Sequence, residues 1–351
     1  MHQPRHPLHL NRAGLRYAAM LGVGGIGFGE FFQLTGNHTL GREESRAGRF
    51  LDRRDYCKLH IISHYVKVLL GPGFAVYPIG RIGGDDVGRR IMGEIREIGI
   101  EDRFILESQG AQTLYSLCFI YPDGSGGNLT TEDSACAGVD AAAVDAAAGT
   151  MREFAGRGVA LAVPEVPLSA RRRMLELATA HKLLRCAAFN SGEIDAMLAG
   201  GFPAITDLLA LNIHEAAMIA GLDSEKTDPE AIIDAAVSKL RGLNPWIMVS
   251  FTVGSRGSWL WDGQRLSRQT AITIPPVSTA GAGDAHFGGL IVGLVAGLPP
   301  ADAHQLAALV ASHKITSRHT IDARIDRVSL AAFAAENKIA LNPALAGLMR
   351  D

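Results

Sequence analysis

Apolar stretches of strand length alternate with longer amphipathic stretches along most of the chain. The strand-like stretches begin with YAAMLGVG at Tyr17 and recur at 76–83, 159–165, 185–190, 207–212 and 246–253. Segments with helical spacing lie between them, and two apolar helices follow a glycine turn at 281–284. Strands that alternate with helices of roughly ten to fifteen residues indicate parallel βαβ units, so the pattern predicts an α/β fold.

Two segments break this alternation. Residues 36–48 are polar and contain glycine, and 113–131 alternate like a half-exposed strand that ends in the turn PDGSGG. Such stretches are typical of a small antiparallel flap. We therefore expect a lid built from 31–50 and 105–133.

Size and charge narrow the range of partners. Of 351 residues, 47% are hydrophobic and 20% are charged, and 34 Lys plus Arg against 36 Asp plus Glu leave a formal net charge of −2. No global positive field is available to hold nucleic acid or an anionic membrane surface. The longest apolar run, at 287–298, covers twelve residues, whereas spanning a bilayer needs about 20. We expect neither nucleic-acid nor membrane partners.

The N-terminus and the cysteines indicate a cytoplasmic protein. Residues 1–16 carry Arg and His without the continuous apolar stretch of a secretory signal, so we expect a flexible tail before one folded domain at 17–351. The four cysteines are scattered and form no CxxC pair. This spacing favours buried thiols over a disulfide framework or a zinc site.

The most informative stretch is Val277–Gly289, where small residues at 280–283 precede Asp284 and an apolar helix. Small residues let the backbone turn tightly at the start of that helix, whose N–H groups and positive dipole end bind anions. An Asp at this place can accept a proton from a hydroxyl that attacks a bound phosphate. An Asp after a glycine turn also commonly caps a helix, so the motif alone leaves both roles open.

With its surroundings, this stretch resembles the C-terminal signature D-T-x-G-A-G-D-x-F-x-G-G of the ribokinase-like (PfkB) family of carbohydrate kinases. The chain matches the signature, with Phe287 displaced by one position, at Thr279, Gly281, Ala282, Gly283, Asp284, Gly288 and Gly289. The resemblance implies a three-layer α/β/α sandwich with a mostly parallel central sheet and a small β lid. It also implies that Asp284 is the general base and that the N–H groups of Ala282, Gly283 and Asp284 form an anion hole beside Gly281.

Other landmarks of the family follow in the expected order. Thr252, Gly254 and Gly257 fit a T-x-G-x-x-G after a late strand, which in the family lies against the nucleotide. Asn212 and Glu215 fit an N-x-x-E at a strand end, where the resemblance implies that an amide and a carboxylate organise hydrated Mg²⁺ and phosphate. Taken alone, an Asn followed three residues later by Glu is more simply a helix cap with a capping box.

The resemblance covers the chain from near Tyr17 to near Phe333. Residues 80–88 fit the early G-x-x-G-x-D-x-x-G of the family, in which Asp85 is expected to cap a helix. The adenine pocket is expected to come partly from the last helices, where the candidates are Ala308, Ser312 and His313.

The segments expected to face the acceptor depart from the family. Glu30 is the nearest acidic residue after the first strand, where relatives carry an Asp that binds sugar hydroxyls. The G-G-x-x-x-N motif is missing from 59–65, which instead carries His60 and His64 four residues apart. This spacing puts both imidazoles on one helical face. We expect Glu30, His60 and His64 to bind the substrate, while two half-buried structural histidines fit the same spacing.

Ser278 is a further departure. It stands where the signature has its leading Asp, which helps to hold a monovalent cation in many relatives. A neutral hydroxyl is a weaker ligand for that ion, so we expect activity to depend little on K⁺.

A competing motif lies near the start of the chain. Residues 22–27 read as a literal G-x-G-x-x-G after a strand, with Glu43 and Glu44 about 20 residues further on. A dinucleotide site needs a helix that opens at the third glycine. The segment FGEFFQLTGN follows instead, with two more glycines and no helical stripe, which argues against an NAD-dependent oxidoreductase.

The sequence as a whole predicts ATP-dependent phosphorylation of a hydroxyl on a sugar or related polyol, with Mg²⁺ bridging the phosphates near Glu215. The resemblance also suggests a homodimer formed through the lid. The alternative from another class is a non-catalytic sugar or nucleotide sensor with the same fold. The altered acceptor motif favours the sensor, and the intact G-A-G-D argues against it. The sequence identifies neither the sugar nor the hydroxyl.

Overall fold

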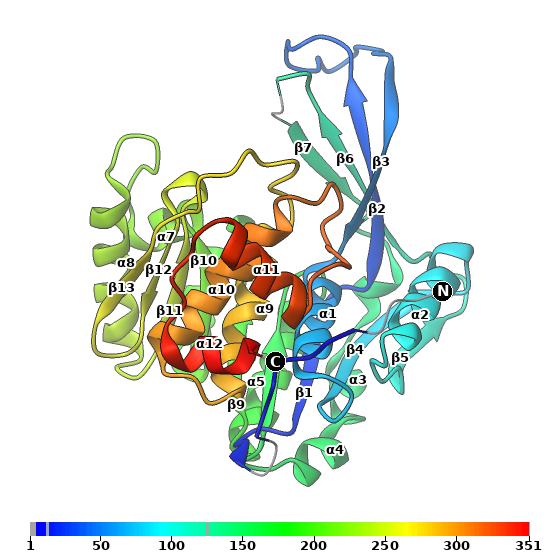
Figure 1. Cartoon of the computed structure of the whole chain (residues 1–351). Coiled ribbons are helices and arrows are strands. Elements are labelled where there is room, and N and C mark those ends of the chain that lie inside the picture. The colour runs from blue at the N-terminus through cyan, green and yellow to red at the C-terminus, as the bar shows by residue number, and fades with distance from the viewer. Residues whose placement is uncertain (1–4, 12–13, 124–125, 351) are drawn as a thin grey trace.

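A twisted, mostly parallel sheet forms the centre of the protein (Figure 1). The computed structural model describes residues 5–11, 14–123 and 126–350, and within them the sheet has nine strands in the order β13-β12-β11-β10-β9-β8-β1-β4-β5. Neighbours from β11 to β5 are parallel, and β12 and β13 are antiparallel at one edge. The strands are β1 (Ala19–Val23), β4 (Ala75–Gly83), β5 (Phe104–Ser108), β8 (Gly158–Ala162), β9 (Leu184–Ala188), β10 (Leu208–Asn212), β11 (Met248–Thr252), β12 (Ser258–Trp261) and β13 (Leu266–Gln269).

The central strands are apolar along their whole length because helices cover both faces of the sheet. Successive residues of β1 enter opposite cores: Met20 packs with one hydrophobic cluster, while Leu21 and Val23 pack with the other. β1 and β8 are buried at every position. Strands of this kind read as continuous apolar runs rather than as alternating ones.

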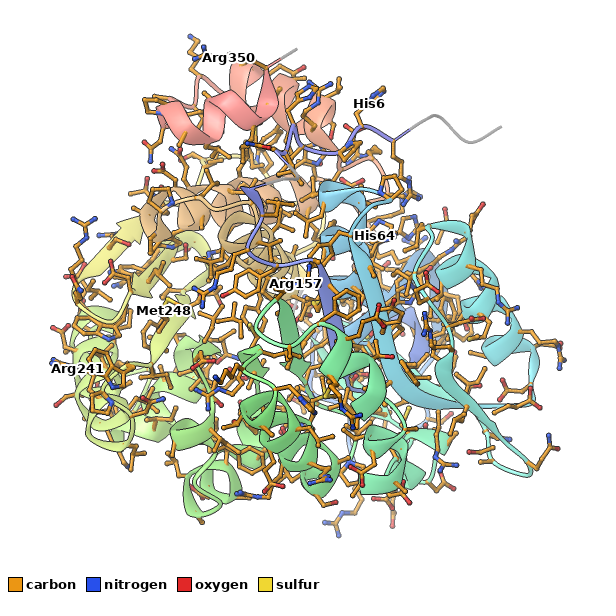
Figure 2. All side chains as sticks on the ribbon, turned by 90° about the horizontal axis from the view of Figure 1, so that it is seen from below. His6, His64, Arg157, Arg241, Met248 and Arg350 are labelled. Carbon is orange, nitrogen blue, oxygen red and sulfur yellow. The ribbon has the colours of Figure 1, made fainter. Side chains whose placement is uncertain are left out.

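Helices from different parts of the chain form the two outer layers. One layer contains α1 (Lys58–Leu70), α2 (Asp86–Glu97), α9 (Ala282–Val295), α10 (Pro300–Lys314), α11 (Arg327–Glu336) and α12 (Pro343–Met349). The other contains α3 (Ala141–Asp145), α4 (Ala148–Glu153), α5 (Leu168–Ala180), α6 (Ile194–Ala199), α7 (Ile213–Ala220) and α8 (Pro229–Leu243). Figure 2 shows the strands between these two sets of helices. The three-layer α/β/α sandwich predicted from the sequence is confirmed.

Short turns complete the elements. Single turns of 3-10 helix lie at Ala135–Gly138, Ser191–Glu193, Phe202–Ile205 and Gly254–Arg256. Asp85 caps α2 as expected, since its carboxylate accepts the Gly88 N–H at 2.7 Å. No helix in the described ranges is long and apolar enough to cross a bilayer. All four cysteines carry free thiols, and three of them are buried.

A second sheet projects from the body as the lid (Figure 1). Its order is β3-β2-β6-β7, with β2 parallel to β6 and the other pairs antiparallel. The lid strands are β2 (Gly27–Leu34), β3 (Gly48–Tyr56), β6 (Leu114–Ile120) and β7 (Gly126–Thr130).

The lid boundaries differ from those expected. The first lid segment is longer than 31–50, because β2 and β3 stay paired down to Phe28 and Tyr56 at the body. The second begins later than 105, because β5 pairs with β4 in the central sheet. Residues 124–125 of the expected lid lie outside the described residues.

The N-terminal segment was expected to be a flexible tail, and its described part corrects this. Leu8 is buried, and its N–H donates to the Leu69 carbonyl at 2.9 Å. The His9 N–H donates to the Leu348 carbonyl at 2.9 Å. The segment therefore ties α1 to the C-terminal helix, and this contact depends on residues far apart in sequence. Residues 1–4 and 12–13 of the expected tail lie outside the described ranges.

Candidate active site

Asp284 lies in the first turn of α9, directly after a backbone turn that favours glycine. Gly281, the N-cap, has φ +77°, and a Cβ there would lie 2.7 Å from the Thr320 carbonyl oxygen. The first N–H groups of a helix have no acceptor within it, and its N-terminal end is positive. The Ala282 N–H already donates to the Thr279 carbonyl at 3.1 Å. The candidate anion site therefore uses Gly283 and Asp284, which corrects the expectation that Ala282 supplies a third donor.

Two cavities meet at this turn. The smaller, of about 260 Å³, is lined by Asp284 and by residues from α1, β10, α7 and β11. The larger, of about 470 Å³, lies between the loop after β11, residues 269–276 and α10. Thr252, Gly283 and His286 line both cavities. A ligand in the larger cavity can therefore reach Asp284 past Gly283.

The residues predicted to contact a nucleotide gather around the larger cavity. Thr252, Gly254 and Gly257 line one side, and Ala308 and Ser312 of α10 line another. Gly257 permits a close backbone contact that a side chain would prevent. It has φ +98°, and a Cβ there would lie 2.1 Å from the Gln269 carbonyl oxygen.

His313 does not join these residues. Its ring is buried under Phe333, and its Nδ1 lies 3.2 Å from a carboxylate oxygen of Asp322. Next to Ser312 on α10, it points to a different side of the helix. The structure thus corrects the expectation that His313 contacts the nucleotide.

Asn212 and Glu215 lie at the end of β10, where the chain enters α7. The Asn212 side chain accepts the Glu215 N–H at 2.9 Å, and Glu215 accepts the Asn212 N–H and side-chain amide at 2.8 Å each. The pair therefore forms the capping box that the sequence also allowed. Both residues nevertheless line the cavity of Asp284. Glu215 is only 6% exposed, and burial raises the pKa of its carboxyl group.

Lys58 forms an ion pair with Asp284 that the sequence did not predict. Its Nζ lies 3.0 Å from Asp284 Oδ1, and the two side chains are 33% and 16% exposed. Attraction to Asp284 raises the pKa of Lys58, and Glu215 and Glu165 add to the effect. A cation at a helix N-terminus is opposed by the helix dipole. The surrounding carboxylates compensate for this at the start of α1.

Glu165 is a second unpredicted group. It follows β8 with a φ of +74°, a strained value for a residue other than glycine. Burial raises the pKa of its carboxyl group to about 7, against the attraction of Lys58. Among the described residues its Oε2 has no hydrogen-bond partner. Gly25 leaves room for it, since a Cβ there would lie 2.5 Å from the Cβ of Glu165.

Asp55 supplies a third unpredicted group from the base of the lid. It accepts hydrogen bonds from Ser116 Oγ at 3.1 Å and Cys118 Sγ at 3.2 Å on β6. Burial raises the pKa of Asp55, and the nearby Asp284 adds to the effect. We call Lys58, Glu165 and Asp55 the Lys58 cluster. It supplies ionisable groups from α1, the loop after β8 and β3 around Asp284.

Two of the three residues predicted to bind the substrate lie elsewhere. His60 and His64 line a separate cavity of about 610 Å³ beside Arg54 and Arg324, whose lining does not include Asp284. Burial lowers the pKa of His60 to about 4 and also lowers the pKa of His64, so both rings are neutral near pH 7. Glu30 lies on lid strand β2, where its carboxylate accepts the Tyr115 hydroxyl at 2.7 Å. The two histidines are thus separated from Asp284, against expectation, while the substrate-binding role of Glu30 stays a prediction.

The glycines at 22–27 serve packing. The third glycine, Gly27, begins strand β2 and not a helix. A Cβ at Gly22 would lie 2.6 Å from Leu59, and one at Gly24 would lie 2.4 Å from Val163. The motif lets β1 pass close to α1 and β8, which agrees with the sequence-based argument against a dinucleotide site.

Weak signals in the sequence could have pointed to the Lys58 cluster. Lys58 is a cation at the first position of a largely apolar helix, a place that the helix dipole disfavours. Glu165 lies between Pro164 and Pro167, just after a buried strand. Residues at the carboxyl ends of parallel strands commonly belong to ligand sites. Neither signal says that the two residues meet at Asp284.

Comparisons with known proteins address the family and the fold of the chain. The family model described as pfkB family carbohydrate kinase matches residues 65–327. No curated protein sequence matches the chain.

Solved structures show the same fold. Ribokinase from Giardia lamblia is 22% identical with a TM-score of 0.71, and the match covers 85% of this chain and 94% of that one. Arabidopsis thaliana ribokinase complexed with ribose and ATP is 18% identical with a TM-score of 0.73, covering 92% and 100%. Burkholderia thailandensis nucleoside kinase in complex with inosine is 15% identical with a TM-score of 0.67, covering 90% and 98%.

Proposed function

Because the chain belongs to the pfkB family of carbohydrate kinases, we propose that it transfers the γ-phosphoryl group of ATP to a hydroxyl of a sugar or related polyol. One observation carries the proposal. Asp284 lies at the positive end of α9, in a cavity that adjoins a second cavity large enough for a nucleotide. A base, anion donors and a nucleotide-sized groove in one place suit phosphoryl transfer.

The nucleotide is proposed to lie in the larger cavity. Its base and ribose would contact Ala308 and Ser312 on one side and Gly254 and Gly257 on the other. Its phosphates would point past Thr252 to the turn at Gly281–Asp284. Two structural neighbours are described as complexes with ATP or ADP, which supports a nucleotide in this groove.

Mg²⁺ fits the residues present if it arrives with the nucleotide. In the described part of the chain no group of three or more His, Cys, Asp and Glu side chains could hold a metal by itself. Mg²⁺ usually keeps several waters and is held by one or two carboxylates and substrate phosphates. Glu215, with Asn212, would hold its water shell, and the ion would neutralise charge on the phosphates.

The chain's own residues account for the proton and for the charge. The Asp284 carboxylate accepts the proton of the acceptor hydroxyl while the oxygen attacks phosphorus. The N–H groups of Gly283 and Asp284 stabilise the transferred group. Lys58 donates a hydrogen bond to Oδ1 of Asp284, which orients the carboxylate and leaves Oδ2 for the hydroxyl.

The acceptor is proposed to bind between the Lys58 cluster and the lid. Glu165 and Asp55 offer carboxyl oxygens to hydroxyl groups, and the unpartnered Oε2 of Glu165 is one such acceptor. Neighbours are described with ribose or inosine bound, which supports a polyhydroxylated ligand. Pairing of subunits through the lid remains a proposal, supported by the exposed apolar side chains of Phe50 and Leu129 on the lid.

ADP release with Mg·ATP across a panel of sugars, polyols and nucleosides tests the function, with Asp284→Asn as the matched control. We expect wild type to phosphorylate at least one acceptor. Asp284→Asn should turn over that acceptor more slowly by a factor of about 10² or more. If no acceptor is phosphorylated by a protein that binds ADP, the kinase proposal fails.

The ion pair between Lys58 and Asp284 favours one alternative, a non-catalytic sugar or nucleotide sensor. In such a protein the lysine would neutralise a carboxylate that no longer accepts protons. The same panel distinguishes the two, because a sensor binds a sugar together with nucleotide but releases no ADP.

A further inference from the structure

The buried ammonium group of Lys314 lies directly behind the turn that leads to Asp284. Lys314 is the last residue of α10 and is 0% exposed. Its Nζ donates to the Ser278 carbonyl at 3.0 Å and also to the Ala280 carbonyl. The N–H groups of Val277 and Ser278 both donate to the Ile315 carbonyl. Hydrogen bonds with Lys314 and Ile315, at the end of α10, thus fix residues 277–280, which lead into the turn.

This ammonium has an unusual set of partners. Among the described residues no carboxylate forms an ion pair with it, and its hydrogen bonds go to neutral carbonyls. The charged groups that act on it from a distance are Asp322, Asp284, Asp55 and Arg53. A buried charge without a charged partner is costly. An apolar residue would fill the same space at lower cost, so the charge needs another explanation.

The direction of the Ser278 and Ala280 carbonyls explains the buried charge. In a trans peptide, a carbonyl and the following N–H point in opposite directions. Anchoring Ser278 and Ala280 on Lys314 therefore aims the N–H groups of Thr279 and Gly281 away from it. Thr279 lines the larger cavity, and Gly281 lines the cavity of Asp284. The lysine thus sets the orientation of the backbone that faces both cavities.

We propose that Lys314 is a positioning residue that serves as a built-in cation: it holds the Ser278 and Ala280 carbonyls so that the N–H groups of Thr279 and Gly281 face the phosphate site, in place of a bound monovalent metal ion. The inference rests on the proposed function only in taking the turn as a phosphate site. It gives a physical reason for independence from K⁺, beyond the neutral side chain of Ser278.

The test compares Lys314→Ala with wild type in buffers that contain choline, Na⁺, K⁺ or NH₄⁺ as the only monovalent cation. Two quantities are measured, the affinity for Mg·ADP by calorimetry and the midpoint of thermal unfolding. In wild type neither should depend on the cation. In Lys314→Ala with choline, the affinity should fall roughly ten- to hundredfold, the range expected for a lost hydrogen bond to a charged group. K⁺ or NH₄⁺ should restore part of the affinity and raise the midpoint.

Lys67→Ala is the matched control. Lys67 is also a buried lysine whose ammonium donates to a backbone carbonyl, that of Phe74 at 3.0 Å, but it lies at the other end of α1 from Lys58. Its loss should lower stability without making ADP affinity depend on K⁺. If Lys314→Ala does not fold, Lys314→Gln keeps a donor without the charge and should fold with weakened ADP binding.

The outcomes separate this inference from the proposed function. Cation-dependent unfolding of Lys314→Ala supports the built-in cation even if wild type binds no nucleotide, a result that would sink only the proposed function. A tenfold gain of wild-type affinity on adding K⁺ would overturn the inference. Loss of stability in Lys314→Ala that no cation relieves, with ADP affinity unchanged, would overturn it as well.

Discussion

The two sides of Asp284 are built in different ways. On the nucleotide side, short backbone turns form much of the cavity wall. Gly281 and Gly257 have positive φ, and Thr252 and Gly283 line both cavities. On the acceptor side, the Lys58 cluster brings side chains from α1, the loop after β8 and the base of the lid close to Asp284. The first side keeps the signature of its family, and the second departs from it. Phosphate binding by a backbone turn tolerates few changes, whereas side chains around an acceptor can be exchanged.

The largest effect is expected where the two sides meet. Asp284→Asn should lower turnover by about 10² to 10⁴, because an amide cannot take the proton of the acceptor hydroxyl. Nucleotide binding should persist, since the turn keeps its backbone. Steady-state kinetics together with ADP titration would check both parts. A variant that keeps more than about a tenth of wild-type turnover would mean that Asp284 is not the base.

A pair of glycine variants divides backbone strain from ligand contact on the nucleotide side. Gly281→Ala should cost about 2 to 4 kcal/mol of unfolding free energy, because it places a Cβ at positive φ against the Thr320 carbonyl. Gly283→Val should spare more of the stability and damage turnover, since a Cβ at Gly283 meets only Thr252 Oγ1, at 3.8 Å, and points into the cavity.

Urea unfolding and kinetics of both variants would check this division. The positive φ belongs to Gly281 and not to Gly283, so backbone strain is expected in Gly281→Ala alone. Unchanged kinetics in Gly283→Val with unchanged stability would show that no phosphate approaches the turn.

Lys58→Met tests the acceptor side. It should lower kcat by roughly ten- to hundredfold, the range of a hydrogen bond between charged groups. The KM for Mg·ATP should stay nearly constant, because Lys58 lines the cavity of Asp284 and not the larger one. Lys58→Arg is the control and should retain more activity than Lys58→Met. A rise in turnover in Lys58→Met would instead show that the lysine blocks the base.

Glu165 should make stability depend on pH. Its pKa of about 7 lies above that of an unfolded glutamate, so its contribution is fully present below about pH 4.5 and is lost as pH rises through 7. Its share of the free energy of unfolding should fall by roughly 3 kcal/mol as pH rises between these limits. Glu165→Gln should flatten this slope in denaturant titrations at about pH 5 and about pH 8. An identical slope in the variant would place the titration on another group.

The smallest effect is expected from the two histidines. His60→Phe and His64→Phe should change the KM for the sugar by no more than about twofold, because both rings line a cavity without Asp284 and are neutral near pH 7. Acceptor kinetics across pH would check this. A large rise in KM would return these residues to the substrate site that the sequence suggested for them.

The fold and the nucleotide side could be predicted from the sequence more fully than the acceptor side. Apolar runs at β1 and β8 mark a sheet buried on both faces, and this pattern is local. The turn at Gly281 is also local, since one glycine and one short helix start create it. The lid boundaries were less readable, because β5 and the lid strands have similar alternation and differ only in the sheet that they join.

His60 and His64 show most clearly what residue spacing in the sequence cannot predict. Their spacing correctly places both on one face of α1, but it cannot say which neighbour that face meets. The face meets residues 316–324, while Lys58, at the start of the same helix, meets Asp284. A difference of two residues at the helix start, from Lys58 to His60, thus separates a charged partner of Asp284 from a buried ring.

By itself the sequence determined the α/β class, the family signature and the turn that presents Asp284, because these depend on hydrophobic period and on backbone freedom within a few residues. Only the tertiary structure decided that Lys58, Glu165 and Asp55 surround Asp284 and that Lys314 lies behind the turn. These groups come from strands and helices up to 259 residues apart in the chain. Their ionisation depends on burial and on one another, and neither exists before the layers pack together.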